Sequence, residues 1–212
     1  MKKLLFLICF IASINAWSQK KTVENEAKYF TNWMDKIVHL SEEQKKEMIT
    51  LRTNFIVDKQ ALKNSKVSTT LDRKQLNKEY WKERDKILTK DQRILLSTHL
   101  VTSREIKEIN EIVSLDKDQQ QSFYDTYQIV NFKLMKDKKE YGRYSDKYIE
   151  TAQVAAIKKK EIINDLLLTG QKSKYDSYFD DLKQRKKHAT FATAEEEIEI
   201  DGYNILEPIG FK

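Results

Sequence analysis

The sequence predicts an all-α protein made of long antiparallel helical hairpins arranged as two units in tandem. Glycine and proline are scarce: only Gly142 and Gly170 precede Gly202, and the single proline is Pro208. β architectures rich in tight turns need these residues, so their scarcity argues against such folds. Apolar residues recur at helical spacing along most of the chain. A helix-start signal, Leu-(Ser/Thr/Asp)-x-x-Gln, also recurs, and it sets the boundaries described below.

Residues 1–18 have the features of a secretory signal peptide. Two lysines precede an apolar run from Leu4 to Ala12, and Ala16 and Ser18 place small residues where a signal peptidase cleaves. A bilayer span needs about 20 apolar residues, so this run is too short to be a membrane anchor. We expect a mature chain that is exported across the inner membrane to the periplasm and does not span the membrane. The sole cysteine lies inside this signal, so the mature chain is expected to fold without disulfides.

The first predicted unit covers residues 19–101. An apolar stripe between Glu26 and Leu40 predicts its first helix. A second helix is expected to begin at Ser41 and to end before the polar segment 64–70, which is typical of a loop. A third helix follows from Leu71, and a fourth begins after Thr89.

The second predicted unit covers residues 102–190. Thr102 to Glu105 forms a Thr-x-x-Glu box, at which we expect the preceding helix to break. A long helix after Asp116 is expected to weaken near Gly142. Another runs toward Leu168, and the last ends near Lys187.

The recurring signal has a physical explanation as a capping box. The side chain of the Ser, Thr or Asp accepts a hydrogen bond from a free amide of the first helical turn, while the glutamine reaches back to the amide of the cap. The fourth copy is one residue short between Leu168 and Gln171, so Thr169 and Gln171 are not expected to form the same reciprocal bonds, although Leu167 does have the right spacing to Gln171. The motif residues are Leu40, Ser41 and Gln44; Leu88, Thr89 and Gln92; Leu115, Asp116 and Gln119; and Leu168, Thr169 and Gln171.

The copies divide into two similar halves. The leucines are 48 residues apart in the first half, Leu40 to Leu88, and 53 apart in the second, Leu115 to Leu168. Four aligned signals with similar helices around them favour a tandem duplication of a hairpin unit. Capping boxes are common at helix starts, so it is the arrangement, more than any single box, that supports this interpretation.

These motifs resemble those of the Spy and CpxP family of periplasmic stress proteins, in which two Leu-Thr-x-x-Gln motifs lie in one helical domain. The copy from Leu88 to Gln92 fits fully, those at Leu40 and Leu115 differ at the cap, and the resemblance extends over residues 26–187 as two such units. Family members are curved hairpins that pair into a cradle-shaped dimer. The resemblance implies ATP-independent binding of unfolded or misfolded envelope proteins, or inhibition of a membrane stress sensor. A chain with two units could be a monomer or a homodimer.

The sequence contains no pattern that indicates catalysis, a cofactor or a metal site. His39, His99 and His188 are scattered, and glycine is too rare for a phosphate-binding loop. We therefore expect a protein that binds other proteins and is not an enzyme. A purely structural envelope protein remains a further alternative.

Adjacent apolar residues suggest where such a protein would bind its clients. A thin layer of helices cannot bury both members of pairs such as Trp33 and Met34, so some would form exposed patches beside basic residues. Attraction between charges would speed the encounter, and apolar contact would retain the client. The candidate client-binding residues are Trp33, Met34, Arg52, Phe55, Trp81, Arg84 and Tyr124.

The charge of the chain is unevenly distributed. The formal net charge is +6, but residues 191–212 carry six acidic side chains against Lys212 alone, a net −5. Without this predicted flexible tail and the two lysines of the signal, the remaining body carries +9. Export makes nucleic acid an unexpected partner for this positive charge. The tail is instead expected to compete with clients for the basic body.

Overall fold

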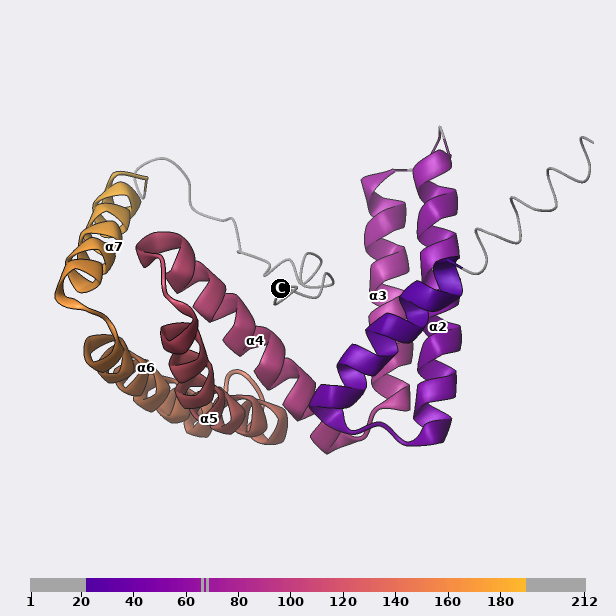
Figure 1. Ribbon diagram of the computed structural model, residues 1–212, viewed down its shortest axis with the longest axis horizontal. Coiled ribbons are helices and arrows are strands. Elements are labelled where there is room, and N and C mark those ends of the chain that lie inside the picture. Colours follow the sequence, from indigo (N-terminus) through magenta and orange to yellow (C-terminus); the bar gives the residue numbers. More distant parts are fainter. Residues whose placement is uncertain (1–21, 66, 68, 190–212) are drawn as a thin grey trace, which may run out of the picture. The chain divides into compact units, whose positions relative to one another are not determined.

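The computed structural model describes residues 22–65, 67 and 69–189 of the chain (Figure 1). Nearly all of these residues are helical, and no strand occurs among them, so the prediction of an all-α fold is confirmed. The predicted signal peptide and the predicted acidic tail lie outside the described residues. No helix in the described part of the chain combines the length and the apolar character needed to cross a membrane.

Short connections separate the helices. α2 packs against α3, and α5 packs against α6 (Figure 1). α5 ends at the glycine that the sequence marked as a weak point: Gly142 has a φ of 85°, a conformation that strains residues with a side chain. The helices are residues 22–38, α2 (Glu42–Asn64), α3 (Thr70–Ile87), α4 (Lys90–Val113), α5 (Lys117–Tyr141), α6 (Asp146–Leu166) and α7 (Thr169–Ala189).

The chain forms two compact units, which meet in sequence between residues 93 and 94, inside the first turn of α4. The sequence placed this boundary between residues 101 and 102. The helix break predicted at Thr102 to Glu105 is wrong, because α4 is continuous from Lys90 to Val113. The Thr102 hydroxyl is fully buried and accepts a hydrogen bond from the Asn131 amide of α5, so it does not act as a cap.

Each unit has its own core. In the first, Phe30, Met34, Met48, Phe55 and Tyr80 are buried between the helix of residues 22–38, α2 and α3. In the second, α4, α5 and α6 enclose a cluster centred on Phe123, which is completely buried. The other members of this cluster are Ile106, Ile109, Val113, Leu115, Tyr127, Ile163 and Leu167. Most apolar positions of the sequence pattern are therefore used for packing within a unit.

Candidate functional site

The motif glutamines meet in pairs, one pair in each unit. In the first unit, the Gln44 and Gln92 side-chain amides exchange two hydrogen bonds of 2.8 and 2.9 Å. In the second, Gln119 and Gln171 do the same at 2.8 and 3.0 Å. Each pair joins the starts of two helices that are about 50 residues apart in the sequence. The sequence predicted the cap but gave no signal for this pairing.

Each glutamine also bonds to two backbone groups. Its oxygen accepts the N–H of the cap residue, as Gln44 does from Ser41 at 3.0 Å. Its second amide N–H donates a hydrogen bond to a backbone carbonyl in the turn that precedes the partner glutamine. These carbonyls belong to Ile87, His39, Leu166 and Ser114, for Gln44, Gln92, Gln119 and Gln171 respectively. The hydrogen-bonding capacity of these side chains is thus used for structure, and the motif does not offer a free binding group.

The first motifs of the two units also share the geometry of the residues just before them. His39 and Ser114, which precede the motif leucines, both have left-handed backbones, with φ of 54° and 56°. The backbone N–H of Leu40 donates a 2.8 Å hydrogen bond to the side chain of Asp35, five residues earlier. The N–H of Leu115 donates the equivalent 2.8 Å bond to the side chain of Asn110. Lys45 bonds to Asp35 and holds the pKa of that carboxyl below its usual value.

The structure corrects the register of the fourth motif. Leu167 is 7% exposed and takes the buried leucine position, whereas Leu168 is 66% exposed. The Leu168 N–H bonds to Gln171 at 3.1 Å, as the Thr89 N–H bonds to Gln92 at 2.9 Å. The copy therefore has no deletion: Leu168 occupies the cap position, and Thr169 is the first residue of α7. A leucine has no side-chain oxygen, so this helix start lacks the usual cap bond.

Three of the seven candidate client-binding residues are buried. Met34, Phe55 and Arg52 lie in the core of the first unit, where they cannot contact a client. The prediction of a surface role for these three is wrong, because the packing of the helix of residues 22–38, α2 and α3 covers their side chains. The other four are partly exposed; they are Trp33, Trp81, Arg84 and Tyr124.

Arg52 is a core cation enclosed by aromatic rings. Its guanidinium carbon lies 4.3 Å from the ring centroid of Phe30, 5.4 Å from that of Phe55 and 5.8 Å from that of Tyr80. Glu26 is 3.7 Å away, and Nε and Nη1 of Arg52 have no hydrogen-bond partner among the described residues. Cation–π attraction is strongest when water is excluded, so the rings are the main stabilising contacts of this charge. Burial raises the pKa of the Tyr80 hydroxyl.

The second unit places a lysine close to a ring. Lys159 of α6 lies 5.4 Å from the ring centroid of Tyr127 and bonds to Glu105 at 2.6 and 2.8 Å. Glu105 also accepts a 2.8 Å hydrogen bond from Asn131. Burial raises the pKa of the Tyr127 hydroxyl strongly. This network connects α4, α5 and α6 inside the second unit.

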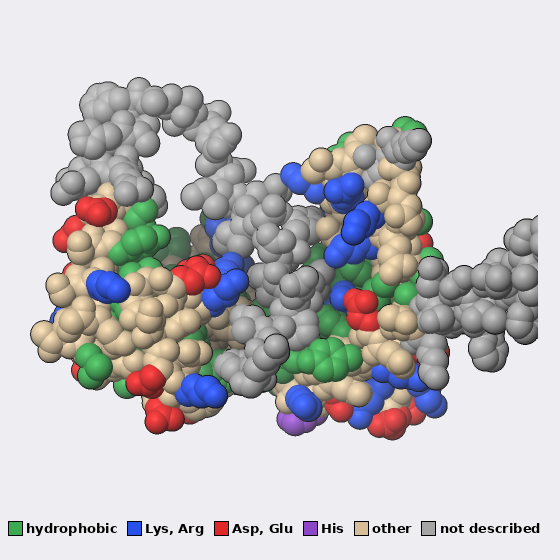
Figure 2. Space-filling model, turned by 45° about the horizontal axis from the view of Figure 1, so that its top comes forward, with side chains coloured by type: hydrophobic (Ala, Val, Ile, Leu, Met, Phe, Trp, Pro, Cys, Tyr) green, Lys and Arg blue, Asp and Glu red, His purple; other side chains and the backbone are tan. Residues whose placement is uncertain are grey.

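A basic and apolar stripe runs along α3. Leu71, Lys74, Lys78 and Lys82 follow one another at spacings of three and four residues, so they share one face of the helix, and all are exposed. None of the three lysines forms an ion pair with another described residue. Trp81 lies at the edge of this α3 stripe, with the Arg84 guanidinium 4.2 Å from its ring. Figure 2 shows Lys and Arg side chains gathered on part of the first unit, which contains α3, with hydrophobic side chains beside them.

Other exposed apolar side chains lie on the outer faces of α5 and α6. Ile129 and Phe132 are exposed on α5, as are Val154 and Ile157 on α6. Their spacing along each helix does not match that of the apolar stripe that forms the core. This difference in spacing is the sequence signal that could have identified them, because a helix cannot bury apolar residues on two opposite faces in one core.

In comparisons with known proteins, no family model, no curated protein and no solved structure matches this chain. Among the described residues, no group of three or more His, Cys, Asp or Glu side chains is placed to hold a metal ion.

Proposed function

We propose that this chain is an exported, Spy-like holdase, which binds unfolded or misfolded proteins of the periplasm without ATP. The observation that carries the proposal is the α3 stripe, where three exposed lysines without ion pairs lie in line with Leu71 and next to Trp81. Unfolded chains expose both carboxylates and apolar side chains. The stripe offers complementary groups for both.

The physical basis is a weak, adaptable contact. Lysine ammonium groups on flexible stems attract acidic segments over several ångströms and need no fixed partner geometry. Trp81 and Leu71 then add apolar contact area. Such a surface holds many sequences with modest affinity, which suits a chaperone that must release its clients.

The motif arrangement supports membership of the Spy and CpxP family by a duplicated chain. Both units carry the same glutamine pair and the same left-handed residue before the first motif. Two hairpins in one chain would provide what family members assemble from two chains. The proposal therefore favours a monomer as the active form, with a homodimer as the alternative.

An aggregation assay tests the proposal. The purified chain should suppress aggregation of several unrelated unfolding clients at stoichiometric ratios without ATP. Replacing Lys74, Lys78 and Lys82 with glutamine should abolish most of this suppression. A matched control replaces Lys46, Lys59 and Lys63, which are exposed lysines of α2 in the same unit, and should leave the suppression intact.

Two results would contradict the proposal. One is that the unmodified chain does not slow aggregation of any client. The other is that the α2 and α3 variants behave alike, which would mean that total charge matters and the stripe does not. Capture of one stoichiometric membrane protein, without suppression of aggregation, would favour a CpxP-like regulator that docks on a sensor domain.

A further inference from the structure

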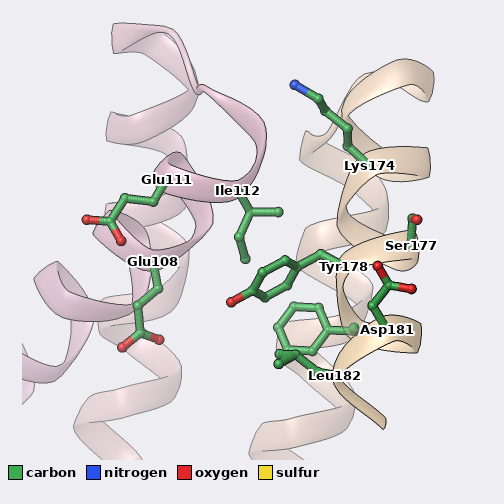
Figure 3. Close-up of a pocket in the computed structure, with 9 residues that line it drawn as sticks. Glu108, Glu111, Ile112, Lys174, Ser177, Tyr178, Asp181 and Leu182 are labelled. Atoms are coloured by element: carbon green, nitrogen blue, oxygen red, sulfur yellow. The ribbon is translucent and has the colours of Figure 1, made fainter. Parts of the chain in front are cut away.

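A groove of about 550 Å³ lies within the second unit, between the C-terminal half of α4 and α7 (Figure 3). Its lining combines apolar side chains with carboxylates, and the charge differs in sign from that of the α3 stripe. Among the described residues, no helix follows α7 to cover it. The lining residues are Glu108, Glu111 and Ile112 of α4, and Lys174, Ser177, Tyr178, Phe179, Asp181 and Leu182 of α7.

The apolar part of the groove is held in place by the core. Phe179 packs against Tyr175 with ring centroids 4.6 Å apart and against Tyr178 at 5.4 Å with perpendicular rings. Tyr175 in turn packs on the core cluster of this unit. Tyr178 and Phe179 nevertheless remain 45% and 36% exposed. These rings form a preorganised apolar surface, so a partner would lose little free energy in ordering them.

The rim of the groove is acidic. The lining contains three carboxylates, those of Glu108, Glu111 and Asp181, and one cation, Lys174. Arg104 and Lys107 approach Glu108 and Glu111 only at 3.7 and 3.9 Å, and all four of these side chains are about one-third or more exposed. Exposed ion pairs of this kind contribute little to stability, so a cation that enters the groove can replace them.

We infer that the groove binds a segment of another protein in which lysine or arginine alternates with aromatic or aliphatic residues. The apolar stem of a bound lysine or arginine would lie on Phe179 and Tyr178, and its charged end would reach the carboxylates. The ring faces add cation–π attraction. The inference is independent of the proposed holdase activity, because it uses none of the residues of the α3 stripe.

The charge of the groove disfavours the chain's own C-terminal segment as the occupant. Residues 191–212 follow α7 closely in sequence, but their net charge of −5 would be repelled by the three carboxylates. A basic segment from another protein has the complementary charge. This difference makes the two occupants distinguishable by experiment.

Fluorescence anisotropy of a labelled synthetic peptide tests the inference on the purified full chain. The probe is an amphipathic helix of leucine and lysine, compared with the same peptide carrying glutamate in place of lysine. The lysine peptide should bind and the glutamate peptide should not. Phe179→Ala should weaken binding by about tenfold, as is typical for an aromatic anchor. Glu108→Gln with Glu111→Gln should weaken it by about threefold at low salt and less at high salt.

Matched controls keep the size and charge of these changes at other sites. Phe132→Ala removes a comparably exposed ring from α5, and Glu150→Gln with Glu161→Gln removes two exposed carboxylates from α6. Both should leave peptide binding unchanged, as should the glutamine variant of the α3 lysines. A loss of holdase activity without loss of peptide binding would thus separate the two proposals.

Three outcomes would overturn the inference. The first is equal binding of the lysine and glutamate peptides. The second is unchanged binding in both groove variants. The third is binding that occurs only after residues 191–212 are removed, which would identify that segment as the occupant. If Phe179→Ala reduces the helical circular dichroism signal, Tyr178→Ser and the glutamate variants decide the question instead.

Discussion

The two units share one framework but stabilise an interior cation, buried in the first unit and partly buried in the second, in different ways. Arg52 lies eight residues after Gln44, and Tyr127 lies eight residues after Gln119; Tyr80 and Lys159 each lie eight residues before the second motif leucine of their unit. The cation and the ring have therefore exchanged helices. Their separations remain similar, at 5.8 Å in the first unit and 5.4 Å in the second.

The surroundings of the two cations differ. Arg52 lies against three rings, and its acidic partner Glu26 is 54% exposed at 3.7 Å. Lys159 has one ring and a close, largely buried carboxylate, Glu105, at 2.6 Å. A guanidinium is weakly hydrated and stacks on rings, whereas an ammonium is a compact charge that needs oxygen partners. The same helical framework therefore accommodates either an arginine or a lysine, provided that each cation has the contacts suited to it.

Removal of the two acidic partners should separate the units most clearly. Glu105→Ala removes the carboxylate partner of Lys159 and one of the two acceptors of the Asn131 amide, which keeps Thr102. We expect a loss of about 3 kcal/mol in the free energy of unfolding. Glu26→Ala should cost less than about 1 kcal/mol, because Arg52 keeps its rings. Urea unfolding of both variants measures the difference. Equal losses would show that the acidic partner matters equally in both units.

The glutamine pairs should behave alike in the two units. Gln44→Ala and Gln119→Ala each remove a cap bond, a bond to a turn carbonyl and half of the amide pair, and each should cost about 2 kcal/mol. In double-mutant cycles, Gln44 with Gln92 and Gln119 with Gln171 should show a coupling of about 1 kcal/mol. Gln121→Ala, at an exposed position of α5, is the control and should have little effect. Additive losses within a pair would contradict the importance of the reciprocal bonds.

The fourth motif offers a test in which a mutation should stabilise the protein. Leu168→Thr restores a cap oxygen at the start of α7 and should add about 1 kcal/mol. The reciprocal change Thr89→Leu, at the start of α4, should remove about the same amount. Thermal unfolding of both variants gives the comparison. A loss on Thr169→Ala, combined with no gain on Leu168→Thr, would instead support Thr169 as the cap.

The histidines of the two units should give the smallest effect. The His99 Nδ1 lies 2.6 Å from the Tyr124 hydroxyl, and burial lowers the pKa of His99; His39 is exposed. The folded state therefore favours neutral His99, so its contribution is present above pH about 6.5 and is lost as the pH falls through the lower folded pKa. Unfolding of His99→Gln should depend less on pH below 6.5 than that of His39→Gln. Parallel pH profiles would contradict this assignment.

Much of the local structure could be predicted from particular residues. Ser41, Thr89 and Asp116 precede helix starts, where their side chains satisfy free amides of the first turn. Gly142 marks the end of α5. The box at Thr102 failed because the same residue pattern occurs inside a helix when the hydroxyl has a tertiary partner, which in this protein is Asn131.

The candidate binding residues were harder to predict. The sequence around Met34, Arg52 and Phe55 has the apolar and basic residues expected of an exposed binding patch. Helix packing nevertheless buries all three side chains. The groove brings Glu108 and Ile112 together with Tyr178 and Phe179, about 70 residues away in the sequence. Such a juxtaposition cannot be deduced from spacing along one helix.

The sequence by itself determined the helical class and the three capped motifs, because periodicity and capping depend on residues within a few positions of one another. The tertiary structure decided three further features. These are the pairing of the motif glutamines, the register of the copy at Leu167, and the choice of which aromatic residues are buried. Each depends on which helices pack together, and that choice follows from long-range contacts that the local pattern does not specify.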